Sequence, residues 1–169
     1  MPPHKQISKE AILSSALTMT REKGFDAITA RALAASIGCS TQPIYQSFAD
    51  MKELEKELAA LALRKMLEYI RQQAESGMPR DLAVAFGYVS FAREERFLFQ
   101  LIARNGGFRT PTGSDNFPLL DPKLVIFANG LVFLSAFQAV NFSPEQTKAI
   151  LTEAYQDFKI QTPKVEDQP

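Results

Sequence analysis

The sequence predicts an all-α protein. Apolar residues recur at steps of three and four along most of the chain, which is the spacing of one face of a helix. Ser, Thr and Asp stand where these segments begin and Gly stands where several of them end, as expected for helix caps. No segment shows the alternation of apolar and polar residues that is typical of a half-buried strand.

The first helix is expected between Ser8 and Gly24. The Ser8 side chain can cap its N-terminus, and Glu10 suits the positive end of the helix dipole. Its inward face is one stripe, formed by Ile12, Leu13, Ala16, Leu17 and Thr20. This helix is therefore expected to supply the core for the two helices that follow it.

Residues 29–54 predict two short helices separated by a tight turn. Thr29 can cap the first of them, whose inward residues are Leu33, Ala34 and Ile37. Gly38 is expected to end it, because glycine adopts the left-handed conformation of a helix C-terminus without steric cost.

The second short helix is expected to follow Ser40 as its cap, with Pro43 in the first turn, where a missing N–H is harmless. Ile44 and Phe48 lie one turn apart and face inward. The side chains left facing outward are Thr41, Gln42, Gln46 and Ser47. This geometry is a helix-turn-helix, a motif whose second helix enters the major groove of DNA.

The chain resembles the DNA-binding domain of the TetR (tetracycline-repressor-like) family over roughly its first third. The residues that carry the resemblance are Thr29, Leu33, Ala34, Gly38, Ser40, Ile44, Tyr45, Phe48 and Leu54, after a helix that ends at Gly24 and Phe25. Members commonly carry a lysine at the position of Met51, near a phosphate. Here the lysine is Lys52, so that contact is shifted or absent.

The resemblance implies a fold of two helical parts. An N-terminal three-helix helix-turn-helix DNA-binding domain is expected at residues 1–52. A C-terminal helical ligand-binding and dimerisation domain is expected at 53–161, followed by a flexible tail at 162–169.

Ten residues are predicted to contact DNA. They are Thr29, Arg31, Ser40, Thr41, Gln42, Pro43, Tyr45, Gln46, Ser47 and Lys52. Gln42 and Gln46 share one helix face, and glutamine can pair with N6 and N7 of adenine. The resemblance implies that Tyr45 binds a backbone phosphate. The alternative is a helix-turn-helix that only packs, or that binds protein.

Further helices are predicted beyond this motif. Asp50 and Ser143 are expected to cap two of them, and Gly77–Pro79 and Arg93–Arg96 are expected breaks. The helices are expected at about 50–76, 80–92, 97–105, 124–142 and 144–160, with a long loop over 105–122.

The middle of the chain is rich in aromatic residues. In the resembled family this region holds an apolar cavity for a small-molecule effector, whereas an aromatic stripe at helical spacing is more often plain core, so each of these residues could belong to either. The residues predicted to bind an effector are Phe86, Phe91, Phe97, Leu101, Arg104, Asn105 and Phe127. Arg104 and Asn105 would supply the few polar contacts that such a cavity uses.

The last two helices, Leu124–Phe142 and Pro144–Ile160, are the ones that form a homodimer interface in the resembled family. Residues 124–144 carry no charge, which suits burial between subunits. Two alternatives exist. The first is that both helices close the core of the monomer instead. The second is that Leu124–Phe142 crosses a membrane, which is disfavoured because polar residues interrupt its apolar run and leave it short of the ~20 predominantly apolar residues that a membrane helix needs.

Composition argues against several classes of function. Lys plus Arg equals Asp plus Glu at 19 each, so the charge of the whole chain does not indicate nucleic-acid binding. Residues 1–52 carry six basic and four acidic side chains, an excess of positive charge too weak to indicate DNA binding by itself. With one histidine (His4) and one cysteine (Cys39), we expect no catalytic residues, no metal site and no cofactor. The single cysteine and the absence of a signal-peptide pattern fit the cytoplasm.

The sequence therefore predicts a DNA-binding transcriptional regulator rather than an enzyme. By resemblance it would be a homodimeric repressor on a palindromic operator in double-stranded DNA, released by a small apolar or amphipathic effector. The alternative is a DNA-anchored protein-interaction module that has no small-molecule effector.

Overall fold

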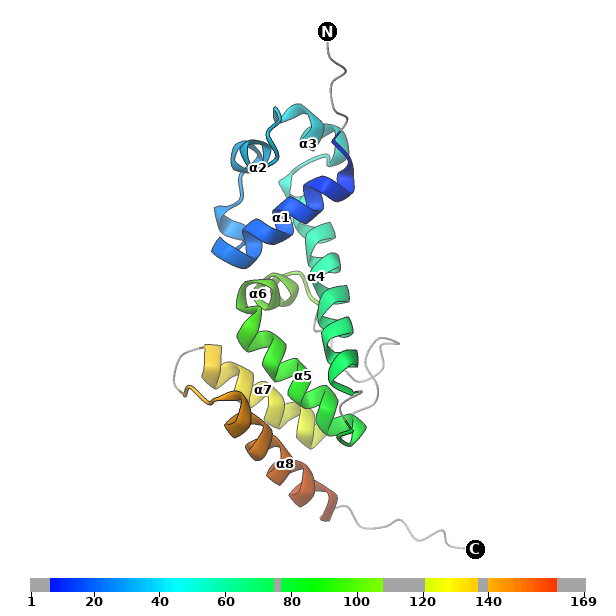
Figure 1. Cartoon of the computed structure of the whole chain (residues 1–169), viewed down its shortest axis with the longest axis vertical. Coiled ribbons are helices and arrows are strands. Elements are labelled where there is room, and N and C mark those ends of the chain that lie inside the picture. Colours follow the sequence, from blue (N-terminus) through cyan, green and yellow to red (C-terminus); the bar gives the residue numbers. More distant parts are fainter. Residues whose placement is uncertain (1–6, 75–76, 108–120, 137–139, 161–169) are drawn as a thin grey trace, which may run out of the picture. The chain divides into compact units, whose positions relative to one another are not determined.

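The computed structural model describes residues 7–74, 77–107, 121–136 and 140–160 (Figure 1). Every element in these ranges is a helix and none is a strand, which confirms the all-α prediction. The elements are α1 (Lys9–Lys23), the 3-10 turn η1 (Phe25–Ala27), α2 (Ala30–Ile37), α3 (Gln42–Ser47), α4 (Met51–Ala74), α5 (Arg80–Glu94), α6 (Arg96–Arg104), α7 (Pro122–Ala136) and α8 (Pro144–Ile160).

The chain divides into two compact units. The first comprises residues 1–65 and 95–109, and the second comprises residues 66–94 and 110–169. The greater part of α4 thus belongs to the first unit, together with α6 and the N-terminal helices. The predicted domain boundary after residue 52 stays a prediction.

In the first unit, α1 packs against α2, α3 and α6. Ser8 caps α1 as predicted, because its hydroxyl accepts the N–H of Ala11 at 3.2 Å. Gly24 ends α1 with φ 78° and donates its N–H to the Thr20 carbonyl at 2.9 Å. The buried core of this unit includes Ile12, Ala16, Leu17, Leu33, Ala34, Ile44, Phe48, Leu54, Leu58, Leu98, Leu101 and Ile102.

In the second unit, α5 packs against α7 and α8, and these two helices pack against each other. Gly87 of α5 allows close approach to α4, since a Cβ there would lie 3.1 Å from the Ile70 Cα. Ser143 caps α8 as predicted: its hydroxyl accepts the Gln146 N–H at 3.2 Å, and the Gln146 side chain accepts the Ser143 N–H at 2.8 Å. This reciprocal pair is a capping box.

Two predicted helix ends are wrong. Ser40 does not cap α3; the position before the helix is Thr41, and no side chain makes a cap bond there. α7 ends at Ala136, and residues 140–142 are not helical, so the prediction of a helix to Phe142 fails. Ser143, which precedes Pro144 and caps α8, sets the latest point at which a preceding helix could end, but it does not account for the earlier end of α7.

The long loop predicted over 105–122 and the tail at 162–169 lie largely or wholly outside the described residues. The structure describes only the first three residues of that loop, a turn over 105–107, and its last two, Asp121 and Pro122.

Candidate nucleic-acid interface

The first helix of the motif, α2, is held by local bonds at both ends. Thr29 accepts the Ala32 N–H on its hydroxyl at 3.1 Å, which confirms the predicted cap. Gly38 is left-handed, with φ 77° and ψ 37°. The N–H of Gly38 and that of Cys39 reach carbonyls of the last turn at 3.2 and 3.0 Å. This pair of bonds is a Schellman motif, so the chain leaves α2 in a fixed direction.

The second helix, α3, is short and is anchored by two apolar side chains. Its six residues begin after Thr41, whose carbonyl accepts the N–H groups of Ile44 and Tyr45 at 3.2 and 3.3 Å. Ile44 is 1% exposed and Phe48, just after the helix, is 2% exposed. A helix this short is not stable by itself in water, so burial of these two residues holds it in place.

The opposite face of α3 is open to solvent. Gln42 and Gln46 are exposed, and Tyr45 is 55% exposed. An exposed large ring with a hydroxyl at its tip can reach a phosphate oxygen, and the two amides can reach base edges. α3 can therefore present polar groups to a groove while its apolar side stays in the core.

The ten predicted DNA contacts lie on α2, the turn, α3 and the start of α4, which lie together in Figure 1. The exposed members are Thr29, Arg31, Ser40, Gln42, Tyr45, Gln46 and Lys52, and the half-buried ones are Thr41, Pro43 and Ser47. That all ten touch DNA stays a prediction.

Two hydrogen bonds fix the beginning of α4, where Lys52 lies. Asp50 accepts the Glu53 N–H on Oδ1 at 2.8 Å, which confirms the predicted cap, and the Glu53 carboxylate accepts the Ala49 N–H. Met51 is half-buried and Lys52 is exposed. Lys52 thus lies one residue after the position, here Met51, at which the resembled family commonly has its lysine.

Lys9 is a structural residue that the sequence did not single out. Its ammonium lies 4.9 Å from the centre of the Phe48 ring and forms an ion pair with Glu57. These contacts join α1 and α4 to the residue that ends α3. The bond to Glu57 spans 48 positions of sequence, so no local pattern could have indicated it.

The seven predicted effector residues fall in both units. Phe97, Leu101, Arg104 and Asn105 belong to the first, and Phe86, Phe91 and Phe127 belong to the second. Leu101 and Phe91 are buried. Two pairs of rings pack edge to face within the second unit: the ring centres are 5.8 Å apart for Phe91 and Tyr69 and 6.1 Å apart for Phe127 and Phe158. A shared effector cavity stays a prediction.

Arg104 forms ion pairs that the sequence did not indicate. Its guanidinium lies 2.7 Å from Asp26 of η1 and 2.9 Å from Glu55 of α4. The hydrogen bond to Asp26, helped by the charge of Glu55, raises the pKa of Arg104. Arg104 therefore ties the end of α6 to two helices of the first unit.

The described residues lack two other features that would point to a different function. No helix there is long and apolar enough to cross a membrane. No three or more His, Cys, Asp or Glu side chains among them gather in a way that could hold a metal ion.

Residues 12–58 match the family described as bacterial regulatory proteins, tetR family. No curated protein matches the sequence. A solved protein of unknown function from Rhodococcus sp. RHA1 is 22% identical with a TM-score of 0.52, covering 94% of this chain and 83% of its own. A protein assigned to the TetR family of transcriptional regulators, from Vibrio parahaemolyticus, is 15% identical with a TM-score of 0.55, covering 88% of this chain and 96% of its own. At these identities the two structures show a shared fold.

Proposed function

Through residues 12–58 the chain is a member of the tetR family of DNA-binding regulators, and from this premise we propose that it acts as a homodimeric repressor. In this proposal the dimer occupies a palindromic operator in the cytoplasm and leaves it when a small apolar or amphipathic effector binds. The observation that carries the proposal is α3, whose exposed Gln42, Tyr45 and Gln46 stand opposite the buried Ile44 and Phe48.

The experiment that tests the proposal is selection of the purified protein on random double-stranded DNA over several rounds, followed by sequencing. Enrichment of a palindrome supports a dimeric regulator, because twofold-related reading helices contact half-sites about 34 Å apart or a multiple of that distance. Salt-sensitive binding without any enriched sequence would contradict it, since phosphate contacts alone give such binding.

Gln42 is the residue whose substitution best separates base reading from phosphate contact. We expect Gln42→Ala to weaken the selected site by ~1–3 kcal/mol and to leave binding to random DNA unchanged. Thr18→Ala, an exposed change on α1 away from the motif, serves as the control. Equal losses of Gln42→Ala on both kinds of DNA would exclude a base contact.

Dimerisation is supported by the exposed face of α7. Ile126 is 73% exposed and Leu134 is 39% exposed, and these positions, eight residues apart, share one face of the helix with the exposed Gly130. Apolar surface left in water costs about 25 cal/mol per Å², so a second copy that covered this face would gain that free energy. Gly130 would let the partner backbone approach closely.

The dimer proposal is tested by light scattering at micromolar concentration. We expect a dimer for the wild-type chain and a monomer for Ile126→Glu, because a carboxylate cannot be buried unpaired in an apolar interface. Gln72→Glu adds the same charge to an exposed site on α4 and should stay dimeric. A monomeric wild-type protein would contradict the proposed interface.

A further inference from the structure

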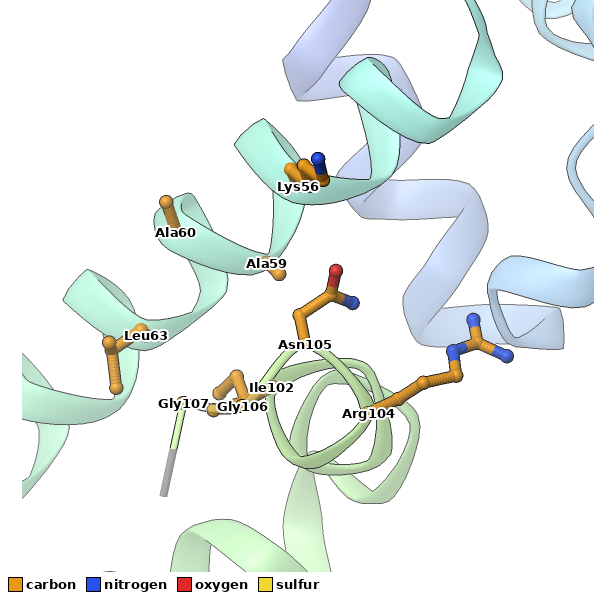
Figure 2. A pocket seen from close by; sticks show the side chains of 9 residues that line it. All are labelled: Lys56, Ala59, Ala60, Leu63, Ile102, Arg104, Asn105, Gly106 and Gly107. Atoms are coloured by element: carbon orange, nitrogen blue, oxygen red, sulfur yellow. The ribbon is translucent and has the colours of Figure 1, made fainter. Parts of the chain in front are cut away.

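A hollow of about 570 Å³ lies within the first unit, between the middle of α4 and the end of α6 (Figure 2). Its volume falls in the range of ~300–1,000 Å³ that is usual for small-molecule sites. Ala59, Ala60 and Leu63 line it from α4, and Ile102, Gly106 and Gly107 line it from the other side. Four of these six residues are alanine or glycine.

The floor of the hollow is apolar and the rim is polar. Ala59 and Ile102 are buried, and Leu63 is half-buried. Lys56 and Asn105 stand at the rim, and Figure 2 shows the Asn105 side chain extending from the end of α6 toward α4. An occupant would thus need an apolar body and a polar end.

The charges around the hollow indicate the sign of that polar end. Two cations line it, Lys56 and Arg104, and the second is already neutralised by Asp26 and Glu55. Lys56 is exposed, and within the described part of the chain no carboxylate lies in ion-pair distance of its ammonium. The unneutralised charge at this rim is therefore positive.

We propose that this hollow binds an amphipathic carboxylate, with the alkyl or ring body against Ala59, Leu63 and Ile102 and the carboxylate at Lys56. A charge-assisted hydrogen bond from an ammonium to a carboxylate is stronger than one between neutral groups. The amide oxygen of Asn105 remains able to accept a bond from a hydroxyl on such a ligand, because its nitrogen already donates to Glu55 and to the Leu101 carbonyl.

The site is connected to the reading helices through side chains of the same unit. Asn105 donates to Glu55 at 3.3 Å, Glu55 also pairs with Arg104, and Arg104 pairs with Asp26 of η1, which precedes α2. A ligand that displaces the Asn105 amide removes one donor from Glu55 and alters this chain of bonds. This link to DNA binding rests on the proposed function. It requires that the ligand change the affinity of the protein for DNA by the same factor by which DNA changes its affinity for the ligand.

The test is isothermal titration of the full chain with decanoate below its micellar concentration, in the absence of DNA. Decanol and decylamine serve as the neutral and cationic counterparts of the same length. We expect one decanoate per chain, with Lys56→Gln weakening it about tenfold or more, as loss of a charged hydrogen bond implies. Lys65→Gln, an exposed lysine further along α4, is the matched control and should bind as wild type.

A second variant tests the position of the apolar body. Ala60→Phe places a ring in the hollow from an exposed position, so the protein should fold as before, by circular dichroism, and lose decanoate binding. Equal binding of decanol and decanoate, or unchanged binding in Lys56→Gln or in Ala60→Phe, would overturn the proposal.

The same ligand is then added to the complex with the selected operator. A shift in DNA affinity for the wild type, but not for Lys56→Gln, supports the connection through Asn105 and Glu55. Decanoate binding without such a shift would overturn that connection and leave the site intact. Because the titration is made without DNA, failure to select an operator would count against the proposed function and not against the site.

Discussion

Substitution of Ile44 by alanine should release α3 from the protein. The change removes three carbon atoms from a side chain that is 1% exposed. At about 0.8 kcal/mol for each buried carbon, the transfer term is ~2.4 kcal/mol, and the cavity left behind adds to it. We expect a total of about 3 kcal/mol. Since α3 has only six residues, little else replaces the lost anchor.

The assay is urea denaturation followed by far-UV circular dichroism, which suits a helical chain without tryptophan. Tyr45→Ala is the matched control: it alters the next residue of α3, which is 55% exposed, and should change stability by no more than about 0.5 kcal/mol. Under conditions where the variant is still folded, Ile44→Ala should also lose discrimination between the selected operator and random DNA.

Two results would refute this reasoning. A loss below about 1 kcal/mol for Ile44→Ala would mean that α3 is not held by burial of that side chain. An equal loss for Tyr45→Ala would mean that the outward face is also packed, which would leave it unavailable to DNA.

Three further substitutions test residues of the first unit. Lys52→Gln should reduce the salt slope, which is the slope of log K for DNA binding against log salt concentration, by about one unit. The reason is that an exposed lysine there can neutralise a phosphate. Lys9→Gln should weaken specific binding with an unchanged salt slope, since Lys9 already pairs with Glu57; slopes that change alike would contradict this distinction. Thr29→Ala should cost ~1 kcal/mol of stability in urea denaturation, because the Ala32 N–H loses its cap. Thr29→Ser should recover most of that loss, and a fully stable Thr29→Ala would show that the cap contributes nothing.

The helix starts and stops that depend on near neighbours were predictable from the sequence. Thr29, Asp50 and Ser143 each cap a helix by accepting an N–H three residues ahead, and Gly38 adopts the left-handed conformation that closes α2. Ser40 is the exception. Ser40 and Thr41 are adjacent and both are plausible caps, and α3 begins after Thr41 without a side-chain cap bond.

The residues of the candidate site also fall into those that were predictable from the sequence and those that were not. Its outward residues on α3 were predictable, because the inward pair Ile44 and Phe48 fixes the opposite face. The roles of Lys9 and Arg104 were not. The partner of Arg104, Asp26, lies 78 positions away, and charge alone does not indicate which carboxylate a basic residue will pair with.

The sequence by itself thus determined the helical class, most of the caps and the helix-turn-helix, because those depend on backbone preferences and on bonds between residues a few positions apart. Only the tertiary structure decided that α6 belongs to the same unit as the reading helices, that Lys9 lies on Phe48, and that a hollow remains between α4 and α6. The physical reason is that such contacts depend on how whole helices pack, and packing brings together side chains whose separation in sequence carries no signal of their proximity.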